Sequence, residues 1–329
     1  MAALVDGFGR VHTDLRVSLT DKCNLRCSYC MPPEGLDWLP GDAVLTDDEV
    51  VRVVGIAVRE LGITDVRLTG GEPLLRRGLV DIVTRLAALE PRPRLALTTN
   101  GIGLARVAAD LAAAGLDRIN VSLDTMHRAT FIALSRRDRL DDVLAGLDAA
   151  RAAGLAPVKV NTVLMRGVNE SEALDLLDYC LEHGLELRFI EQMPLDPQHG
   201  WDRDVMVTAE EIVATLSQRH TLTPVAERGS NPAELFRVDG GPAVVGVIAS
   251  VTKPFCAACD RVRLTADGQV RNCLFATEES DLRTALRTGA DDAVVAARIQ
   301  AAVSRKRAGH GIDDPSFLQP DRPMSAIGG

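Results

Sequence analysis

The sequence lacks several features that would place it in common classes of protein. It has no apolar run close to the roughly 20 residues that cross a bilayer, and residues 1–10 lack the basic-then-apolar pattern of a secretory signal. Basic residues are not in excess, because the formal net charge is −9. This balance argues against a general nucleic-acid-binding surface. We expect a cytoplasmic protein with no membrane or nucleic-acid partner.

What is present is enough for a large globular core. The 329 residues exceed one typical domain but suit a barrel-sized unit with an extension, and 46% of them are hydrophobic. No low-complexity tract interrupts the chain. An anionic substrate would need a local basic pocket inside this acidic protein.

A regular alternation of apolar runs and helical patterns fills most of the chain. Thr46 and Glu49 have the spacing of a capping box at the start of a helix, and Ala-rich helical patterns end at Gly115 and Gly154. Six apolar runs rich in β-branched residues predict buried parallel strands, at residues 15–19, 66–68, 95–98, 119–123, 158–163 and 187–190. Six units are fewer than the eight of a closed barrel. We therefore expect an α/β fold, an incomplete TIM-like (β/α) barrel.

The alternation weakens in the C-terminal third of the chain. Residues 227–242 are rich in Gly, Pro and charge and predict a linker or turn region, and residues 309–323 predict an irregular tail. We expect a barrel of residues 1–226, followed by a C-terminal extension of residues 227–329.

Three cysteines lie within eight residues near the N-terminus. Cys23, Cys27 and Cys30 are separated by three and then two residues, which suits a loop around a [4Fe–4S] cluster. Three thiolates would bind three irons, and the fourth iron would be open to a small molecule. A structural zinc site needs a fourth ligand, and none follows nearby. The odd number of cysteines and the missing signal peptide argue against disulfides.

A second cysteine triad lies far along the chain. Cys256 and Cys259 are followed, after thirteen residues, by Cys273, again with no fourth thiol nearby. We expect a second [4Fe–4S] cluster with its own open iron. The alternative is a zinc ion completed by the distant His220 or His310.

These motifs together resemble a known family. The first triad, with Tyr29 before its last cysteine, resembles the signature of radical S-adenosylmethionine enzymes. Over nearly its whole length the chain resembles the GTP 3′,8-cyclases, the first enzymes of molybdenum cofactor (molybdopterin) biosynthesis. The resemblance is carried by residues 68–73 (LTGGEP), 98–101 (TTNG), 120–124 (NVSLD), 158–161 (VKVN), 187–191 (LRFIE), 255–263 (FCAACDRVR) and 327–329 (IGG).

The resemblance implies a radical reaction catalysed by a lyase. The first cluster would cleave S-adenosylmethionine to a 5′-deoxyadenosyl radical, which would take hydrogen from C3′ of GTP. The carbon radical would attack C8 and give (8S)-3′,8-cyclo-7,8-dihydroguanosine 5′-triphosphate, while the second cluster holds the guanine. The implied partners are an electron donor such as flavodoxin or ferredoxin and the downstream cyclic pyranopterin monophosphate synthase. The resemblance also allows a homodimer.

By resemblance, four residues would contact S-adenosylmethionine, namely Tyr29, Gly71, Ser122 and Met193. The glycine pair at residues 70–71 follows a predicted strand, and without Cβ atoms it would let backbone carbonyls approach that ligand.

The triphosphate of the substrate would need several cations. We expect them at the open carboxyl ends of the parallel strands, where β/α proteins place their sites, and arginine forks suit phosphate. The expected substrate-binding residues are Arg16, Arg67, Thr98, Lys159, Arg188, Arg261 and Arg263. The resemblance also implies that the C-terminal tail enters the active site beside the last two arginines. The expected catalytic residues are therefore Arg261, Arg263, Gly328 and Gly329.

Two further residues stand apart from these assignments. Relatives often carry lysine at the position of Asp65, so one substrate contact is open to question. Cys180 lies in an apolar helical pattern and is expected to be a buried core residue. Two other functions remain alternatives, a different radical enzyme with an auxiliary cluster, such as a peptide maturase, and a non-enzymatic iron–sulfur protein.

Overall fold

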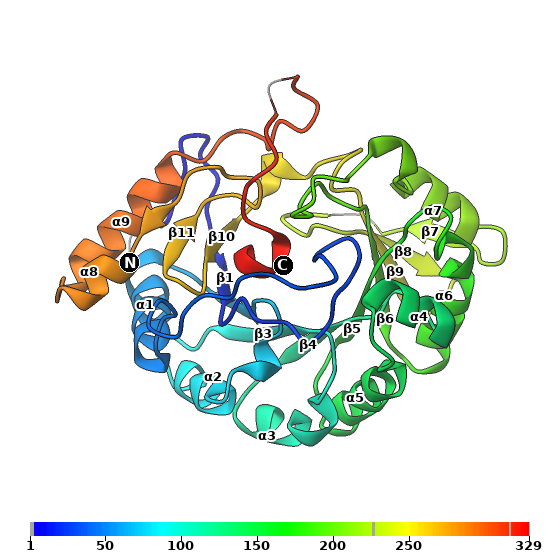
Figure 1. Cartoon of the computed structure of the whole chain (residues 1–329), viewed down its shortest axis with the longest axis horizontal. Coiled ribbons are helices and arrows are strands. Elements are labelled where there is room, and N and C mark those ends of the chain that lie inside the picture. The colour runs from blue at the N-terminus through cyan, green and yellow to red at the C-terminus, as the bar shows by residue number, and fades with distance from the viewer. Residues whose placement is uncertain (1–2, 226–227, 316, 329) are drawn as a thin grey trace.

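One large sheet dominates the computed structural model, which describes residues 3–225, 228–315 and 317–328 (Figure 1). Its strands are β1 (Asp14–Ser18), β2 (Asp65–Thr69), β3 (Arg94–Thr99), β4 (Arg118–Ser122), β5 (Val158–Val163), β6 (Glu186–Ile190), β7 (Leu222–Pro224), β8 (Glu234–Val238), β9 (Val244–Ile248), β10 (Arg261–Leu264), β11 (Gln269–Arg271) and β12 (Ser280–Asp281). The helices are α1 (Asp47–Leu61), α2 (Leu79–Ala87), α3 (Ala108–Ala113), α4 (Arg128–Ser135), α5 (Leu140–Ala152), α6 (Ala173–Glu182), α7 (Ala209–Leu216), α8 (Arg283–Arg287), α9 (Asp292–Ser304) and α10 (Met324–Ile327).

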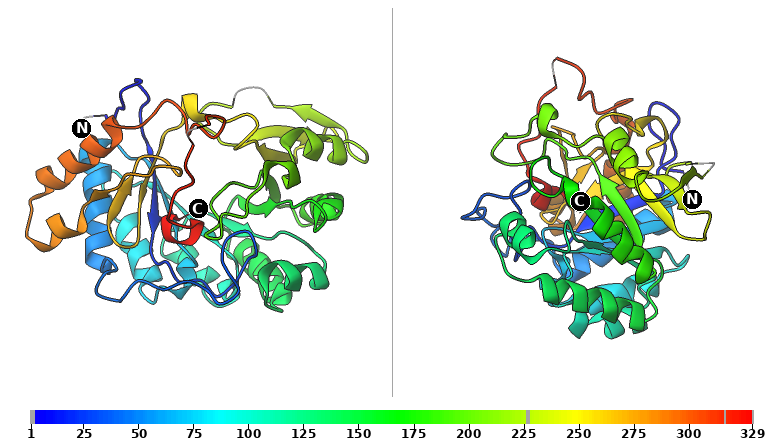
Figure 2. Two further views of the ribbon diagram at one scale, coloured as in Figure 1. Left: turned by 45° about the horizontal axis from the view of Figure 1, so that its top comes forward. Right: turned by 90° about the vertical axis from the view of Figure 1, so that its right-hand side faces the viewer.

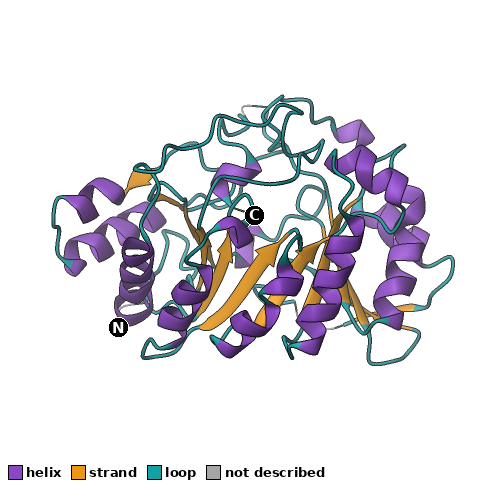
Figure 3. Ribbon diagram, turned by 60° about the horizontal axis from the view of Figure 1, so that its bottom comes forward, coloured by secondary structure: helices purple, strands orange, loops and turns teal. Residues whose placement is uncertain are grey.

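The sheet is an open barrel, as the sequence predicted. Its strand order is β12-β11-β10-β1-β2-β3-β4-β5-β6-β9-β8-β7, and in the described part of the chain the two end strands do not pair. The strands curve around a central space with helices on the outside (Figures 1 and 3). The described residues contain no helix that is both long and apolar enough to cross a bilayer.

The sheet contains more parallel strands than the six that the sequence predicted. β10 pairs in parallel with β1, and β9 pairs in parallel with β6, so eight neighbouring strands run parallel. Both added strands come from the region assigned to the C-terminal extension. The linker predicted for residues 227–242 is wrong in part, because β8 lies within it and pairs with β7 and β9. β8 is short and contains charged residues, so it shows no clear strand pattern in the sequence.

The inner and outer faces of the parallel strands differ sharply. On β1, Leu15 and Val17 face the outer helices in the apolar core, whereas Arg16 faces inward. The outward positions of the next five strands belong to the same core, at Val66, Leu68, Leu95, Leu97, Ile119, Val121, Val158, Val160, Leu187 and Phe189. Apolar residues therefore occupy only alternate positions, and the inner face of the sheet is polar.

Local sequence signals fixed several helix ends. The capping box at Thr46 and Glu49 is present in the structure, and α1 ends at Gly62 in the left-handed conformation. Gly115 and Gly154 also have positive φ values just after α3 and α5, as predicted. Cys180 is fully buried on α6, where burial raises the pKa of its thiol to about 12.

The C-terminal tail returns to the middle of the barrel. Within the described part of residues 309–323 there is no helix or strand, as expected, and the short α10 then follows. Figure 2 shows this segment descending into the molecule, and Figure 3 shows its end above the strands. The tail thus lies over the carboxyl ends of the strands.

We expect Thr46→Ala to lower the free energy of unfolding by about 1 kcal/mol, because it removes the side-chain oxygen that caps α1. Thr46→Ser keeps this oxygen and is the matched control. Anaerobic urea denaturation measures both. Equal stability of the alanine variant and the unchanged protein would show that the cap contributes nothing.

Candidate active site

The first cysteine triad lies on the loop that follows β1. Cys23, Cys27 and Cys30 are free thiols and line a pocket of about 170 Å³. Burial, together with the neighbouring Cys23, raises the pKa of Cys30 to about 12. Thiolates would therefore form in this pocket only with a strong positive partner, which the irons of a cluster supply. The donor set fits a [4Fe–4S] cluster.

The glycines at 70 and 71 bring the triad loop against the end of β2. A Cβ atom on Gly71 would lie 2.4 Å from the carbonyl oxygens of Asp21 and Lys22, and one on Gly70 would lie 2.3 Å from that of Thr20. Gly71 N–H also donates to Thr20 O over 2.7 Å. From the sequence, these glycines were expected to let backbone carbonyls approach a ligand. In the structure, the backbone of the triad loop occupies the space that a side chain would need.

Glu72 ties this turn to the end of β3. Its buried carboxylate accepts hydrogen bonds from Thr99 Oγ1 at 2.6 Å, Asn100 N at 2.6 Å and Leu74 N at 2.9 Å. Burial raises the pKa of Glu72 to about 7, although these donors oppose the shift. Glu72 therefore holds the pocket together.

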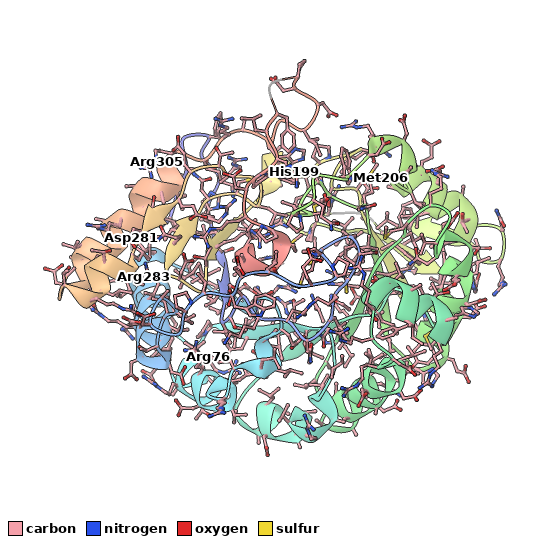
Figure 4. All side chains as sticks on the ribbon, viewed as in Figure 1. Arg76, His199, Met206, Asp281, Arg283 and Arg305 are labelled. Carbon is pink, nitrogen blue, oxygen red and sulfur yellow. The ribbon has the colours of Figure 1, made fainter. Side chains whose placement is uncertain are left out.

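Arg76 fastens the same turn from the other side. Its guanidinium donates to Leu19 O at 3.1 Å, just after β1, and to Leu45 O at 2.7 Å. It also binds Asp47 in the first turn of α1. Figure 4 labels Arg76 beside α2. The loop with the first triad is thus held between β1, β2 and α1.

Three of the predicted S-adenosylmethionine residues line the first pocket. Tyr29, Gly71 and Ser122 share it with the cysteine triad. Tyr29 donates a hydrogen bond to Asp124 Oδ2 over 2.7 Å, and burial raises the pKa of Asp124 to about 6. Met193 lies instead beside the second triad. Its predicted contact with S-adenosylmethionine stays a prediction.

A separate cavity of about 430 Å³ lies inside the barrel. Eight cationic and three acidic side chains line it, although the whole chain is acidic. The cations are Arg16, Arg67, Arg94, Arg118, Lys159, Arg188, Arg228 and Arg261. The cavity is thus a strongly positive site within the lumen.

The position of these cations corrects the sequence analysis. The cavity is lined by Asp14, Asp65, Arg94 and Arg118, which begin β1 to β4. Arg16, Arg67, Lys159 and Arg188 therefore lie toward the amino ends of the strands, and the expectation of carboxyl ends is wrong. Alternate residues face the lumen along the whole length of each strand, so polar side chains line the lumen from the amino ends to the carboxyl ends. Thr98 lies apart from them, in the pocket of the first triad.

Asp65 has a structural role in this cavity. Its carboxylate pairs with Arg94 at 2.6 Å and with Arg118 at 3.2 Å. Both arginines line the cavity, and neither was among the predicted site residues. Each directly precedes a predicted strand and begins the observed one, and alternation from Arg118 leads to Asn120 and Ser122.

Burial perturbs the cations of the lumen. Burial and the neighbouring Arg16 lower the pKa of Arg67 to about 9. Burial and Arg188 lower the pKa of Lys159 to about 8, although Glu186 accepts a hydrogen bond from Lys159 over 2.8 Å. These shifts show that the lumen holds positive charge at an energetic cost.

Several buried polar atoms of the lumen have no hydrogen-bond partner within the described ranges. They are the Nε atoms of Arg16, Arg67 and Arg118, Nε and Nη2 of Arg261, and the side-chain oxygens of Asn120 and Asn161. Buried polar atoms of this kind are normally satisfied. The five arginine nitrogens are charged donors, and they fit an anionic ligand with many acceptor oxygens.

The second cysteine triad lines a pocket of about 70 Å³ beside this cavity. Cys256, Cys259 and Cys273 share it with Arg263. Arg261 lines both the pocket and the lumen cavity. It therefore connects the second triad with the positive lumen.

The zinc alternative finds little support at the two histidines. His220 contacts Asp178 and Asp239 through its two ring nitrogens. His310 lies near Cys256, but its ring nitrogens face Ser250 O and the backbone N–H of Ile312. Both rings are already engaged, so neither offers a free nitrogen as a fourth ligand.

The C-terminal tail contacts both parts of the site. Arg263 Nη1 donates to the carbonyl oxygen of Gly328, and the backbone N–H of Ser325 donates to the thiol of Cys30. A Cβ atom on Gly328 would lie 2.8 Å from Thr69 Cγ2, and Gly328 has a φ of 85°. A side chain would therefore not fit without movement. Gly329 lies outside the described residues.

We expect Glu72→Ala to lower the free energy of unfolding by about 2–4 kcal/mol, because it leaves two buried donors and one partly buried donor without their acceptor. It should also weaken binding of S-adenosylmethionine. Anaerobic denaturation and equilibrium dialysis measure these effects, and Glu60→Ala on the exposed face of α1 is the control. A Glu72 variant as stable as this control would contradict the assigned role.

Comparisons with known proteins agree with this geometry. Residues 17–180 match the family model of the radical SAM superfamily, and residues 185–312 match the model Molybdenum Cofactor Synthesis C. A curated protein of Streptomyces coelicolor, named GTP 3′,8-cyclase, is 66% identical over 328 residues, which cover 99% of this chain and 96% of that protein. A protein of the same name from Mycobacterium sp. (strain KMS) is 63% identical over 327 residues, covering 99% and 93%.

A solved structure shares the fold at much lower identity. Streptococcus suis SuiB bound to S-adenosylmethionine aligns with a TM-score of 0.59 at 12% identity, over 96% of this chain and 76% of that one. This similarity concerns the arrangement of the strands and helices alone.

Proposed function

The chain belongs to the GTP 3′,8-cyclase family of radical S-adenosylmethionine enzymes, and we propose that its positive lumen binds the triphosphate of GTP. It is an enzyme of molybdenum cofactor biosynthesis that joins C3′ and C8 of GTP. Its cofactors are two [4Fe–4S] clusters and S-adenosylmethionine. When bound, the first cluster and S-adenosylmethionine supply the radical chemistry.

The first triad and its neighbours hold S-adenosylmethionine in this proposal. Cys23, Cys27 and Cys30 bind three irons of the first cluster. Gly71 and Ser122 offer backbone and hydroxyl groups to the ligand, and the Tyr29 ring packs beside it. The Tyr29–Asp124 hydrogen bond fixes this ring, so the pocket is ordered before the ligand binds.

The unpartnered guanidinium nitrogens of the lumen are the observation that carries the proposal. Buried nitrogens of Arg16, Arg67, Arg118 and Arg261 have no partner among the described residues, and the phosphates would give these donors acceptors. Lys159 and Arg188, which share Glu186, line the same cavity. Arg94 and Arg118 extend the same site, and Asp65 positions both of them. Thr98 lines the pocket of the first triad, and its contact with the substrate stays a prediction.

The second triad orients the other end of the substrate. Cys256, Cys259 and Cys273 bind three irons of the second cluster, and the guanine lies near it. Arg261 contacts both regions, and its guanidinium carbon lies 4.3 Å from the centre of the Phe255 ring. The Phe255 ring thereby holds the Arg261 guanidinium between the phosphates and the base. Holding both ends of GTP favours attack by C3′ on C8.

The C-terminal tail closes the site above the substrate. Gly328 reaches the active site, where its carbonyl orients Arg263, and we keep the expected catalytic role of Gly329 as part of the proposal. The close packing of Gly328 against Thr69 also excludes water from the carboxyl ends of the strands.

The remaining assignments concern the wider setting of the enzyme. We propose a division at residue 226 between the barrel and the region of the second cluster, although β9 and β10 join the sheet. Seven free thiols suit the reducing cytoplasm. We also propose flavodoxin or ferredoxin as the electron donor, with the cyclic pyranopterin synthase acting on the product. A homodimer is compatible with all of these roles.

The function is tested with anaerobically reconstituted protein supplied with GTP, S-adenosylmethionine and a reductant. We expect about eight irons and eight sulfides per chain, and formation of the 3′,8-cyclised nucleotide. Replacing Cys23, Cys27 and Cys30 by alanine should remove about half of the iron and abolish all cleavage to 5′-deoxyadenosine. Mass spectrometry of the products and iron analysis measure these outcomes.

The second triad gives the matched comparison. Replacing Cys256, Cys259 and Cys273 by alanine should abolish cyclisation yet leave some cleavage of S-adenosylmethionine. Of the two triads, only the first lies in the pocket proposed to bind S-adenosylmethionine. Equal loss of cleavage in both folded triple variants would contradict this division. A stable zinc ion in the anaerobic protein would refute the second cluster.

The tail is tested by deleting Gly328 and Gly329. We expect cyclisation to fall by about 100-fold or more, while iron content and most GTP binding are kept, because a chain end contributes little to the core. Arg263→Ala should lower cyclisation to a similar extent, since it removes the partner of Gly328. Product formation and GTP dialysis separate catalysis from binding.

A peptide of residues 323–329 provides the control for the deletion. Added in excess, it should restore part of the activity of the shortened protein. Full activity of that protein without the peptide would show that the tail has no catalytic role.

A further inference from the structure

A buried lysine lies against the second triad without a carboxylate partner. Lys306 follows α9 and is 5% exposed. Among the residues that the structure describes, no carboxylate lies within ion-pair distance of its ammonium group. Its neighbour Arg305 is exposed and is labelled at the C-terminal end of α9 in Figure 4. A buried ammonium is costly unless it is hydrogen-bonded and its charge is balanced.

The three protons of this ammonium have three acceptors. Lys306 Nζ lies 2.8 Å from Arg261 O, 3.3 Å from Cys259 Sγ and 3.5 Å from His12 Nδ1. The hydrogen bonds are therefore complete, but the charge is not balanced by any carboxylate in contact. The group that it faces is the sulfur of Cys259, which would be negatively charged as a cluster ligand.

An N-terminal loop holds the lysine in this position. His12 is fully buried, and its Nε2 lies 3.0 Å from Asp6 Oδ2. This contact places a proton on Nε2 and leaves Nδ1 as the acceptor for Lys306. The loop itself is pinned by Arg10, which donates to Asp6 Oδ2 at 2.6 Å and to Cys256 O at 2.6 Å.

The same arginine also binds the segment just after the lysine. Arg10 donates to Arg307 O at 2.6 Å and to Ala308 O at 2.9 Å. The loop thus contacts both the second triad and the chain around Lys306. Asp6, Arg10 and His12 precede residue 17, where the family-model match begins.

We propose that Lys306 is the buried counter-ion of the cluster at the second triad, and that Asp6 and His12 are residues that position it. This inference rests on the proposed function, because it takes the second triad as a cluster site. The negative charge of the thiolates and the cluster balances the positive charge of the Lys306 ammonium. The ammonium also donates a hydrogen bond to the Cys259 sulfur. Hydrogen bonds to sulfur and nearby charge set the reduction potential of such clusters. Lys306 therefore favours the reduced, more negative cluster.

The test uses protein in which Cys23, Cys27 and Cys30 are alanine, so that only the second cluster remains. Anaerobic reconstitution should give about four irons per chain. We expect Lys306→Met to shift the midpoint potential to a more negative value and to change the electron paramagnetic resonance spectrum of the reduced cluster. Lys253→Met removes an exposed lysine three residues before Cys256 and should change neither property.

Two further variants keep the test decisive. Lys306→Gln keeps donor groups in the buried site but removes the charge, so it should shift the potential in the same direction if the methionine variant fails to fold. His12→Leu should give a smaller shift of the same sign, because it leaves the lysine but removes its support.

The outcomes separate this inference from the proposed function. Potentials and spectra unchanged in the folded Lys306 variants would overturn the counter-ion role while leaving the cyclase function intact. A background protein that binds no cluster would overturn the second cluster site and this inference with it.

Discussion

The burial of several positive charges in one barrel lumen is the constraint on which the rest of the structure depends. Arg16 is in register with Arg67 on β2 and with Arg263 on β10, so like charges adjoin across three strands. Burial lowers the pKa of each, because a charged guanidinium is less well solvated in the lumen than in water. Asp14 offsets part of the repulsion. The apolar outer face must supply the stability that this lumen does not.

One of the two cysteine triads adjoins this positive lumen. The first triad lies at the carboxyl ends of β2 to β4, and the second adjoins the lumen through Arg261. A loaded second cluster and a triphosphate are anionic, so both balance positive charge of the lumen. The tail links these regions, because it contacts both Cys30 and Arg263. Binding of the ligands and ordering of the site are thus coupled.

Much of this arrangement could be predicted from the sequence, because its signals are local. The capping box at Thr46, the buried Cys180 and the six strands with long apolar runs all follow from short patterns. β8, β9 and β10 were missed, because each is short and the alternation of strand and helix patterns weakens in this part of the sequence. The predicted position of the cations at the carboxyl ends of the strands was also wrong. Alternation along a strand indicates which residues face inward, but not at which end of the strands a cavity lies. Lys306 and Cys259 come from distant segments of the chain, so their contact could not be predicted from residue spacing.

The central claim is that the lumen recognises the phosphates, and a series of ligands of increasing charge tests it most directly. The dissociation constants of guanosine, GMP, GDP and GTP are measured with anaerobic, cluster-loaded protein. If the buried arginines bind phosphate oxygens, affinity should rise with each phosphate, by about tenfold or more from GMP to GTP. Equal affinities across the series would show that the lumen does not hold the triphosphate, and would contradict the account.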